Sequence, residues 1–173
     1  FEILAKKPNS PFLAAGVSAD DWMRYLESAT LQVTAKPENW DKALAVGEQE
    51  IRRAVQHGFT PAELAEAKAN ILTAYENNAQ GAATRKSREL ADQLVKRIAE
   101  HEVFTHPDDD LARVKSTLPA ITPDECHQAF NRDWSNENLR IFVSGNLVLD
   151  NAPATITSSW QASAAQPVSA PVQ

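Results

Sequence analysis

Two histidines, His101 and His106, flank a glutamate in the stretch HEVFTH and are the first candidates for metal or acid–base chemistry. A helix that binds zinc through two histidines places them four residues apart, on one face. A separation of five turns the two rings about 140° away from each other. Pro107 also indicates that His106 lies outside a helix that contains His101. The spacing argues against a zinc site, and we interpret the pair as a polar helix end followed by a loop.

Three further residues are candidates for nucleophilic or acid–base roles. Cys126 lies near the start of an expected helix, where peptide dipoles can make a thiol more reactive. Its neighbour His127 points about 100° away around that helix, so it is not a natural base partner. We interpret Cys126 as a small buried residue. His57 precedes Gly58, and we interpret it as a helix C-terminal residue that the helix dipole favours.

The charged clusters also have structural explanations. Because the chain around them is acidic, Arg85, Lys86 and Arg88 are interpreted as a solvated helix face. The run Asp108–Asp110 fans out around a helix start, where carboxylates suit the dipole but do not form an acid/base pair. Neither a glycine-rich phosphate loop nor a GxSxG motif is present in the sequence. We therefore predict that the chain has no catalytic, cofactor-binding or metal-ligating residue.

A joint between two helices is the best-defined local feature of the sequence. Gly58 suits the end of the first helix because glycine adopts a positive φ at little steric cost. Thr60 and Glu63 then have the spacing of a capping box, in which each side chain bonds the other residue's main chain. Thr122 and Glu125 repeat this device. Each pair predicts the first turn of a helix.

Strands are predicted before and after a block of helices. Leu31 and Val33 alternate with polar residues, which together with the extended segment at 12–17 predicts an antiparallel hairpin interrupted at Asp20. Apolar spacings of three and four then predict about five helices, followed by a short strand at 139–143. The predicted class is α+β, with an antiparallel sheet (N-terminal hairpin plus C-terminal strand) covered by a block of about five helices.

Composition limits the classes of partner. The 173 residues carry 17 Lys and Arg against 23 Asp and Glu, and the net charge of −6 argues against nucleic acid or an anionic membrane as a partner. The single cysteine leaves the compartment open. No apolar run reaches the roughly 20 residues that span a bilayer. The sequence begins at Phe1 without an initiator Met or a signal, so we expect an internal fragment of a longer protein.

The last part of the sequence differs in composition from the rest. From Asn151 onward there is no charged residue, and Ala, Ser, Pro and Gln dominate. Such a segment buries too little apolar area to offset its ordering entropy. We predict a domain over 1–146 and an interdomain linker over 147–173, in which Trp160 is the residue able to dock on the domain.

Three stretches of the sequence resemble the non-catalytic domain of the pitrilysin/insulinase-type zinc metallopeptidases. In that family this domain runs through a strand, a proline, a helix, the motif T-x-x-E-L-x-x-A-K, several helices, a second T-x-x-D/E and a strand ending in glycine. The stretches are KPENWDKALAVGEQEIRRAV, GFTPAELAEAKANIL and ITPDECHQAFNRDWSNENLRIFVSGN. The resemblance covers about 12–146, includes the opening PFLAAG, and implies a LuxS/pitrilysin-like metalloenzyme fold.

The resemblance also implies a division of labour. Family members carry the inverted zinc motif HxxEH in a preceding domain of the same fold, and the motif is absent here. Zinc would belong to that domain, and this chain would form the wall of a closed chamber for peptides and unfolded proteins. Its partners would be the HxxEH domain and a following homologous half, in a periplasmic or secreted protein. The family's substrate-holding Arg and Tyr have no counterpart in residues 1–16.

Two other functions remain open from the sequence. The chain could be a catalytically inactive homologous subunit that partners an active one, or a freestanding α+β module that binds a partner protein through its helices. An HxxEH motif upstream in the same gene would favour the protease domain over both.

Overall fold

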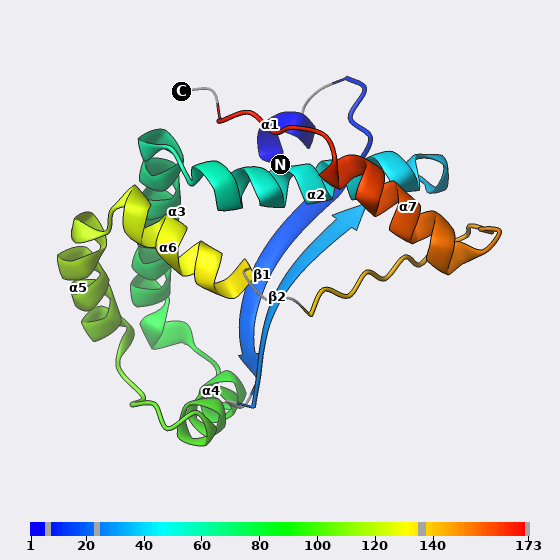
Figure 1. The fold of residues 1–173 in the computed structure, drawn as a ribbon. Helices are drawn as coiled ribbons and strands as arrows, with labels where there is room; N and C mark the ends of the chain where they lie inside the picture. Colours follow the sequence, from blue (N-terminus) through cyan, green and yellow to red (C-terminus); the bar gives the residue numbers. More distant parts are fainter. Residues whose placement is uncertain (6–7, 23–24, 135–137, 172–173) are drawn as a thin grey trace. The chain divides into compact units, whose positions relative to one another are not determined.

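The computed structural model describes residues 1–5, 8–22, 25–134 and 138–171. Two compact units divide the chain: Phe1–Asp20, Glu27–Gly58 and His127–Val172 form one, and Asp21–Leu26 with Phe59–Cys126 form the other. Figure 1 shows a two-stranded antiparallel sheet in a mainly helical chain. The predicted α+β class is confirmed, with α2–α6 as the block of five helices. Within the described ranges we find no helix with both the length and the apolar character that crossing a bilayer requires.

The hairpin consists of β1 (Ala14–Trp22) and β2 (Leu26–Thr34). Its register is fixed at the open end, where the Leu13 amide donates to the Thr34 carbonyl over 2.7 Å. The predicted interruption at Asp20 is wrong, because β1 continues through it to Trp22. Exposure alternates along β2 in the way that a strand with one covered face requires.

Helix α2 (Trp40–His57) follows a 3-10 turn at Pro37–Asn39 and crosses the hairpin near its open end (Figure 1). Gly47 permits the close approach, since a Cβ atom there would lie 2.9 Å from Leu31 Cδ2 and 3.2 Å from Val33 Cγ2. Phe12 and Ala43 are buried in this unit. The rings of Phe1, beside the short helix α1 (Glu2–Ala5), and Phe12 pack edge to face with centroids 6.0 Å apart.

The C-terminal segment contains a helix, α7 (Ala152–Ala164), which packs along α2 (Figure 1). The expectation that this composition cannot order itself is therefore wrong for 152–164. The physical reason is burial against α2, which reaches Ser163 and leaves Trp160 half-buried. That residues 147–173 join two domains stays a prediction.

The predicted strand at 139–143 is not a strand in the structure, since residues 138–149 have neither helix nor strand. Exposure does alternate there, with Ile141 and Val143 half-buried and Phe142 88% exposed. Alternation alone does not make a strand, because the main chain also needs the hydrogen bonds of a neighbouring strand. Within the described residues the sheet contains only β1 and β2.

The second unit is helical. Its elements are α3 (Pro61–Gln80), a 3-10 turn (Ala82–Thr84), α4 (Ser87–Ala99), α5 (Pro107–Thr117), a 3-10 turn (Leu118–Ala120) and the start of α6 (Pro123–Trp134). Helices α3 and α5 pack on each other, and Lys68 on α3 donates to the Pro119 and Ile121 carbonyls at 3.1 and 2.6 Å. In contrast, Val95 and Ile98 on the apolar stripe of α4 are 68% and 63% exposed.

Both predicted capping boxes are present. The Thr60 amide donates to Glu63 Oε2 over 2.7 Å, and the Glu63 amide donates to Thr60 Oγ1 over 3.2 Å. At the start of α6 the same two bonds join Thr122 and Glu125, at 2.8 and 3.3 Å. Each box satisfies main-chain donors that the first turn of a helix leaves free.

The second box makes stability depend on pH. The pKa of Glu125 is lowered, chiefly because its carboxylate accepts a hydrogen bond from the Thr122 amide. A carboxylate of this kind stabilises the fold above its unfolded pKa of about 4.3, and the contribution is lost as pH falls through the lower folded pKa. We therefore expect the urea midpoint to fall more between about pH 6 and about pH 3 in the wild type than in Glu125→Gln. Equal falls in the two proteins would contradict this.

Candidate functional site

The two histidines of the HEVFTH stretch lie beside helix ends. His101 follows α4 in a left-handed conformation with a φ of 57°. His106 is the N-cap of α5, where its Nδ1 accepts from the Asp108 amide over 3.3 Å, so it lies outside α4 as predicted. Among the described residues, no group of three or more His, Cys, Asp or Glu is placed to hold a metal ion. The absence of a metal site stays a prediction.

His127 and His57 both contact main-chain carbonyls. His127 Nε2 lies 2.8 Å from the Val55 carbonyl oxygen, and its ring packs against Gly58. The same nitrogen lies 3.0 Å from Asn131 Nδ2, so its donor or acceptor role depends on the tautomer of the ring. His57 ends α2 as predicted, and its Nε2 lies 3.2 Å from the Val168 carbonyl oxygen. Cys126 is a free thiol that is half-buried, so the interpretation of it as a buried residue is only partly correct.

The three aspartates at the start of α5 have a structural role in the first turn of that helix. Asp108, Asp109 and Asp110 all lie in the first turn. Asp110 accepts from the Thr105 hydroxyl over 2.7 Å and pairs with Arg113. Their position in the first turn is the one that the dipole argument predicts, and the contacts of Asp110 stabilise the turn further.

The face of the hairpin away from α2 is hollowed. The hollow has a volume of about 450 Å³, and its lining combines small β1 residues with polar β2 residues. The lining residues are Ala14, Ala15, Gly16, Val17, Ser18, Thr30, Gln32 and Thr34. Small side chains leave the main chain accessible, and each strand of a two-stranded sheet has an outer edge that can pair with an extended peptide.

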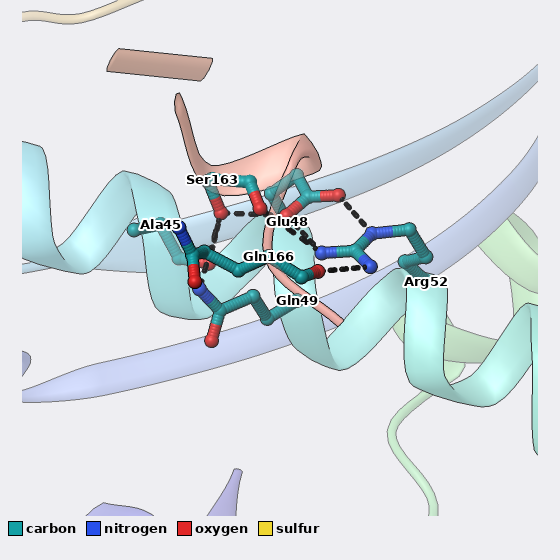
Figure 2. Close-up of polar contacts among 6 residues, drawn as sticks. All are labelled: Ala45, Glu48, Gln49, Arg52, Ser163 and Gln166. Carbon is teal, nitrogen blue, oxygen red and sulfur yellow. Dashed lines mark hydrogen bonds and ion pairs between the residues drawn. The ribbon is translucent and has the colours of Figure 1, made fainter. Parts of the chain in front are cut away.

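A polar cluster joins α2 to α7 (Figure 2). The Arg52 guanidinium donates to both oxygens of Glu48, Nε to Oε1 at 2.6 Å and Nη2 to Oε2 at 3.1 Å. Glu48 is 4% exposed, and it also accepts from the Ser163 hydroxyl over 2.6 Å. The bond to Glu48 raises the pKa of Arg52 further above its ordinary value. The buried carboxylate is thereby paired and hydrogen-bonded, as burial of a charge requires.

The same guanidinium holds the end of α7. Arg52 Nη2 donates to the Ser163 carbonyl over 3.1 Å and Nη1 donates to the Gln166 carbonyl over 2.7 Å (Figure 2). The next residue on α2, Arg53, donates from Nε to the Ser169 carbonyl over 2.9 Å. A basic side chain at the last carbonyls of a helix satisfies acceptors that the helix leaves free.

Comparison with known proteins gives a structural match. No protein-family model matches the chain, and no curated protein matches it. The first half of the periplasmic protease PqqL from Escherichia coli superposes with a TM-score of 0.73 at 19% identity. The match covers 99% of this chain. The chain has the fold of a part of PqqL.

The match is partial with respect to PqqL itself. The chain spans 37% of the PqqL first half and 19% of the whole PqqL structure, which superposes with a TM-score of 0.74 at 18% identity. At these identities the likeness to PqqL establishes the fold, and it transfers no functional residue. It agrees with the fold that the sequence resemblance implies.

The sequence analysis did not predict the polar cluster between α2 and α7. The spacing of Glu48 and Arg52 is i, i+4, which is a recognisable signal for a helix pair. Ser163 gives no such signal, because it follows Glu48 by 115 residues. The hollow could have been anticipated in part, since PFLAAGVS combines strand character with little bulk.

Proposed function

We propose that the chain is a non-catalytic structural domain of a zinc-dependent metalloendopeptidase that cleaves peptides or unfolded proteins. The observation that carries this proposal is the superposition of 99% of the chain on part of the periplasmic protease PqqL. The sequence resemblance to pitrilysin/insulinase-type peptidases supports it independently. The whole activity belongs to a longer polypeptide in this proposal.

The proposal assigns the chemistry to other parts of that polypeptide. A preceding domain with the HxxEH motif binds zinc and supplies the catalytic residues. A homologous half follows, and the enzyme works in the periplasm. PqqL is a periplasmic protease, which supports the compartment and the protease activity, and the match to its first half supports the two-half organisation.

The hollowed face of the hairpin is the part of this chain that we assign to the chamber wall. An extended peptide can pair with the edge of a strand through main-chain hydrogen bonds, which suits an enzyme that accepts varied sequences. Gly16 and the alanines beside it leave room for such a peptide, since a Cβ atom on Gly16 would meet no atom within 4 Å.

Reconstitution tests the assignment. The chain is mixed with the segment encoded immediately upstream in its gene, zinc is added, and cleavage of an unfolded reporter peptide is followed. We expect cleavage by the mixture that neither piece shows alone. The variant Gly16→Phe fills the hollow and is expected to raise KM about threefold or more with little change in kcat, because it removes uniform binding.

The matched control is Ala19→Phe, at an exposed β1 position outside the lining of the hollow. Equal KM values for the two variants would remove the chamber-wall role. A folded, associated mixture without cleavage would overturn the protease assignment.

One observation favours an alternative, a module that binds a partner protein through its helices. Leu94, Val95 and Ile98 give α4 an apolar stripe that is 42%, 68% and 63% exposed. Exposed apolar stripes of this kind mark interaction surfaces. A stable complex that forms with the upstream segment, depends on Val95 and lacks hydrolytic activity would select this alternative.

A further inference from the structure

Four contacts from α2 reach main-chain carbonyls of the C-terminal segment. Arg52 donates to two carbonyls near the end of α7, Arg53 donates to the Ser169 carbonyl, and His57 contacts the Val168 carbonyl. Glu48 and Arg52 lie one turn apart on α2, and so do Arg53 and His57. We call these four residues the polar row (Figure 2 shows its Glu48 and Arg52 part). Charge-assisted bonds to carbonyls are about twice as strong as neutral ones.

Recognition of this kind depends little on side chains in the segment. Residues 151–173 have no charged side chain, so no side-chain charge in the segment attracts or repels the two arginines. Ser163 is the exception, because its hydroxyl donates to Glu48 over 2.6 Å and it is 4% exposed. The segment therefore has one buried anchor and several main-chain attachments.

We propose that the polar row is a latch, from which the segment 152–169 detaches and to which it re-attaches as one cooperative unit. The anchor and the attachments share Arg52, which bonds Glu48, Ser163 and Gln166 together. Loss of Arg52 therefore removes the buried pair and the helix-end contacts in one step. Contiguous segments with shared contacts open as units in this manner.

The latch exists in this chain whether or not the protease proposal holds. Its use in a longer protein rests on that proposed function: a latched segment restrains the path of the polypeptide toward the following half, and an open latch frees it. A chamber that admits unfolded proteins requires such relative movement of its parts.

Amide hydrogen exchange of the full chain, followed by mass spectrometry, tests the latch. In Arg52→Gln we expect the amides of α7 through Gln166 to exchange about tenfold faster or more, with unchanged exchange in α3 and α5. The control is Arg88→Gln, which changes an exposed arginine of α4 and is expected to leave α7 unchanged.

Two results would overturn the proposal: no acceleration in α7, or acceleration confined to the amides next to Ser163. If Arg52→Gln loosens α3 and α5 as well, Arg53→Gln replaces it, since it keeps the Glu48–Arg52 pair. A latch requires that variant to accelerate exchange along the whole of α7, whereas independent attachments would limit the change to residues near Ser169. These outcomes do not depend on proteolytic activity.

Discussion

Replacement of Gly58 by alanine is expected to lower the free energy of unfolding by about 3 kcal/mol. Gly58 ends α2 with a φ of 69° and a ψ of −151°, a combination that essentially only glycine adopts. A Cβ atom there would also lie 3.0 Å from Cγ of the His127 ring. The ring has little freedom to move away, because its Nε2 contacts the Val55 carbonyl over 2.8 Å. Urea denaturation of both proteins measures the difference.

The control separates backbone strain from crowding. Gly145 has a φ of 151°, but a Cβ atom there would meet no atom within 4 Å. Gly145→Ala is therefore expected to lower the free energy of unfolding by about 1 kcal/mol, which is the cost of the backbone conformation alone. If Gly58→Ala lost no more than this control, the packing of His127 on Gly58 would not contribute to stability.

Removal of the Arg52 side chain is expected to cost about 3 kcal/mol, because it leaves a charged Glu48 without its partner in a buried position. Glu48 is 4% exposed, and the hydroxyl of Ser163 alone cannot replace two bonds from a guanidinium. Chemical denaturation of Arg52→Ala, followed by circular dichroism, provides the measurement.

A double substitution shows whether the cost comes from the stranded carboxylate. Glu48→Met combined with Arg52→Met removes both charges, and we expect it to be more stable than Arg52→Ala. Arg53→Ala, which removes a partly exposed cation next along the chain, is expected to cost less than about 1 kcal/mol. A double variant as unstable as Arg52→Ala would show that the lost packing, and not the charge, dominates.

The features that the sequence predicted correctly depend on residues close together in the chain. Both capping boxes involve residues three apart, so the pairs Thr60–Glu63 and Thr122–Glu125 specify the helix starts by themselves. The hairpin follows from the period-two pattern of β2. The placement of His106 outside α4 follows from Pro107. Such signals are complete within a few residues.

The features that the sequence did not predict depend on distant partners. Residues 139–143 have a strand-like pattern, but a strand also needs a neighbour that the local sequence cannot specify. Conversely, α7 has a linker-like composition and becomes ordered because α2 offers a surface for it. Tertiary context overrides local composition in both cases.

The candidate sites show the same difference between signals from nearby residues and contacts with distant ones. Spacing alone argued against a paired metal role for His101 and His106, and against a base role for His127 beside Cys126. What His127 contacts instead, the Val55 carbonyl 72 residues earlier, has no local signal. The polar row shows the same limit, since its arginines are adjacent in sequence but the carbonyls that they bind are 111 to 116 residues away.

The continuation of β1 through Asp20 and Asp21 bears on how copies of the chain meet one another. A long strand with an open edge can pair with a strand of a second molecule, and such pairing leads to aggregation. The two carboxylates lie within the final three residues of β1, and both side chains are exposed. When two such edges pair side by side in parallel, the carboxylates of one copy lie opposite those of the other and oppose the pairing. Asp20 and Asp21, which the sequence suggested as a break in the strand, thus disfavour pairing of its edge with a second copy of the chain.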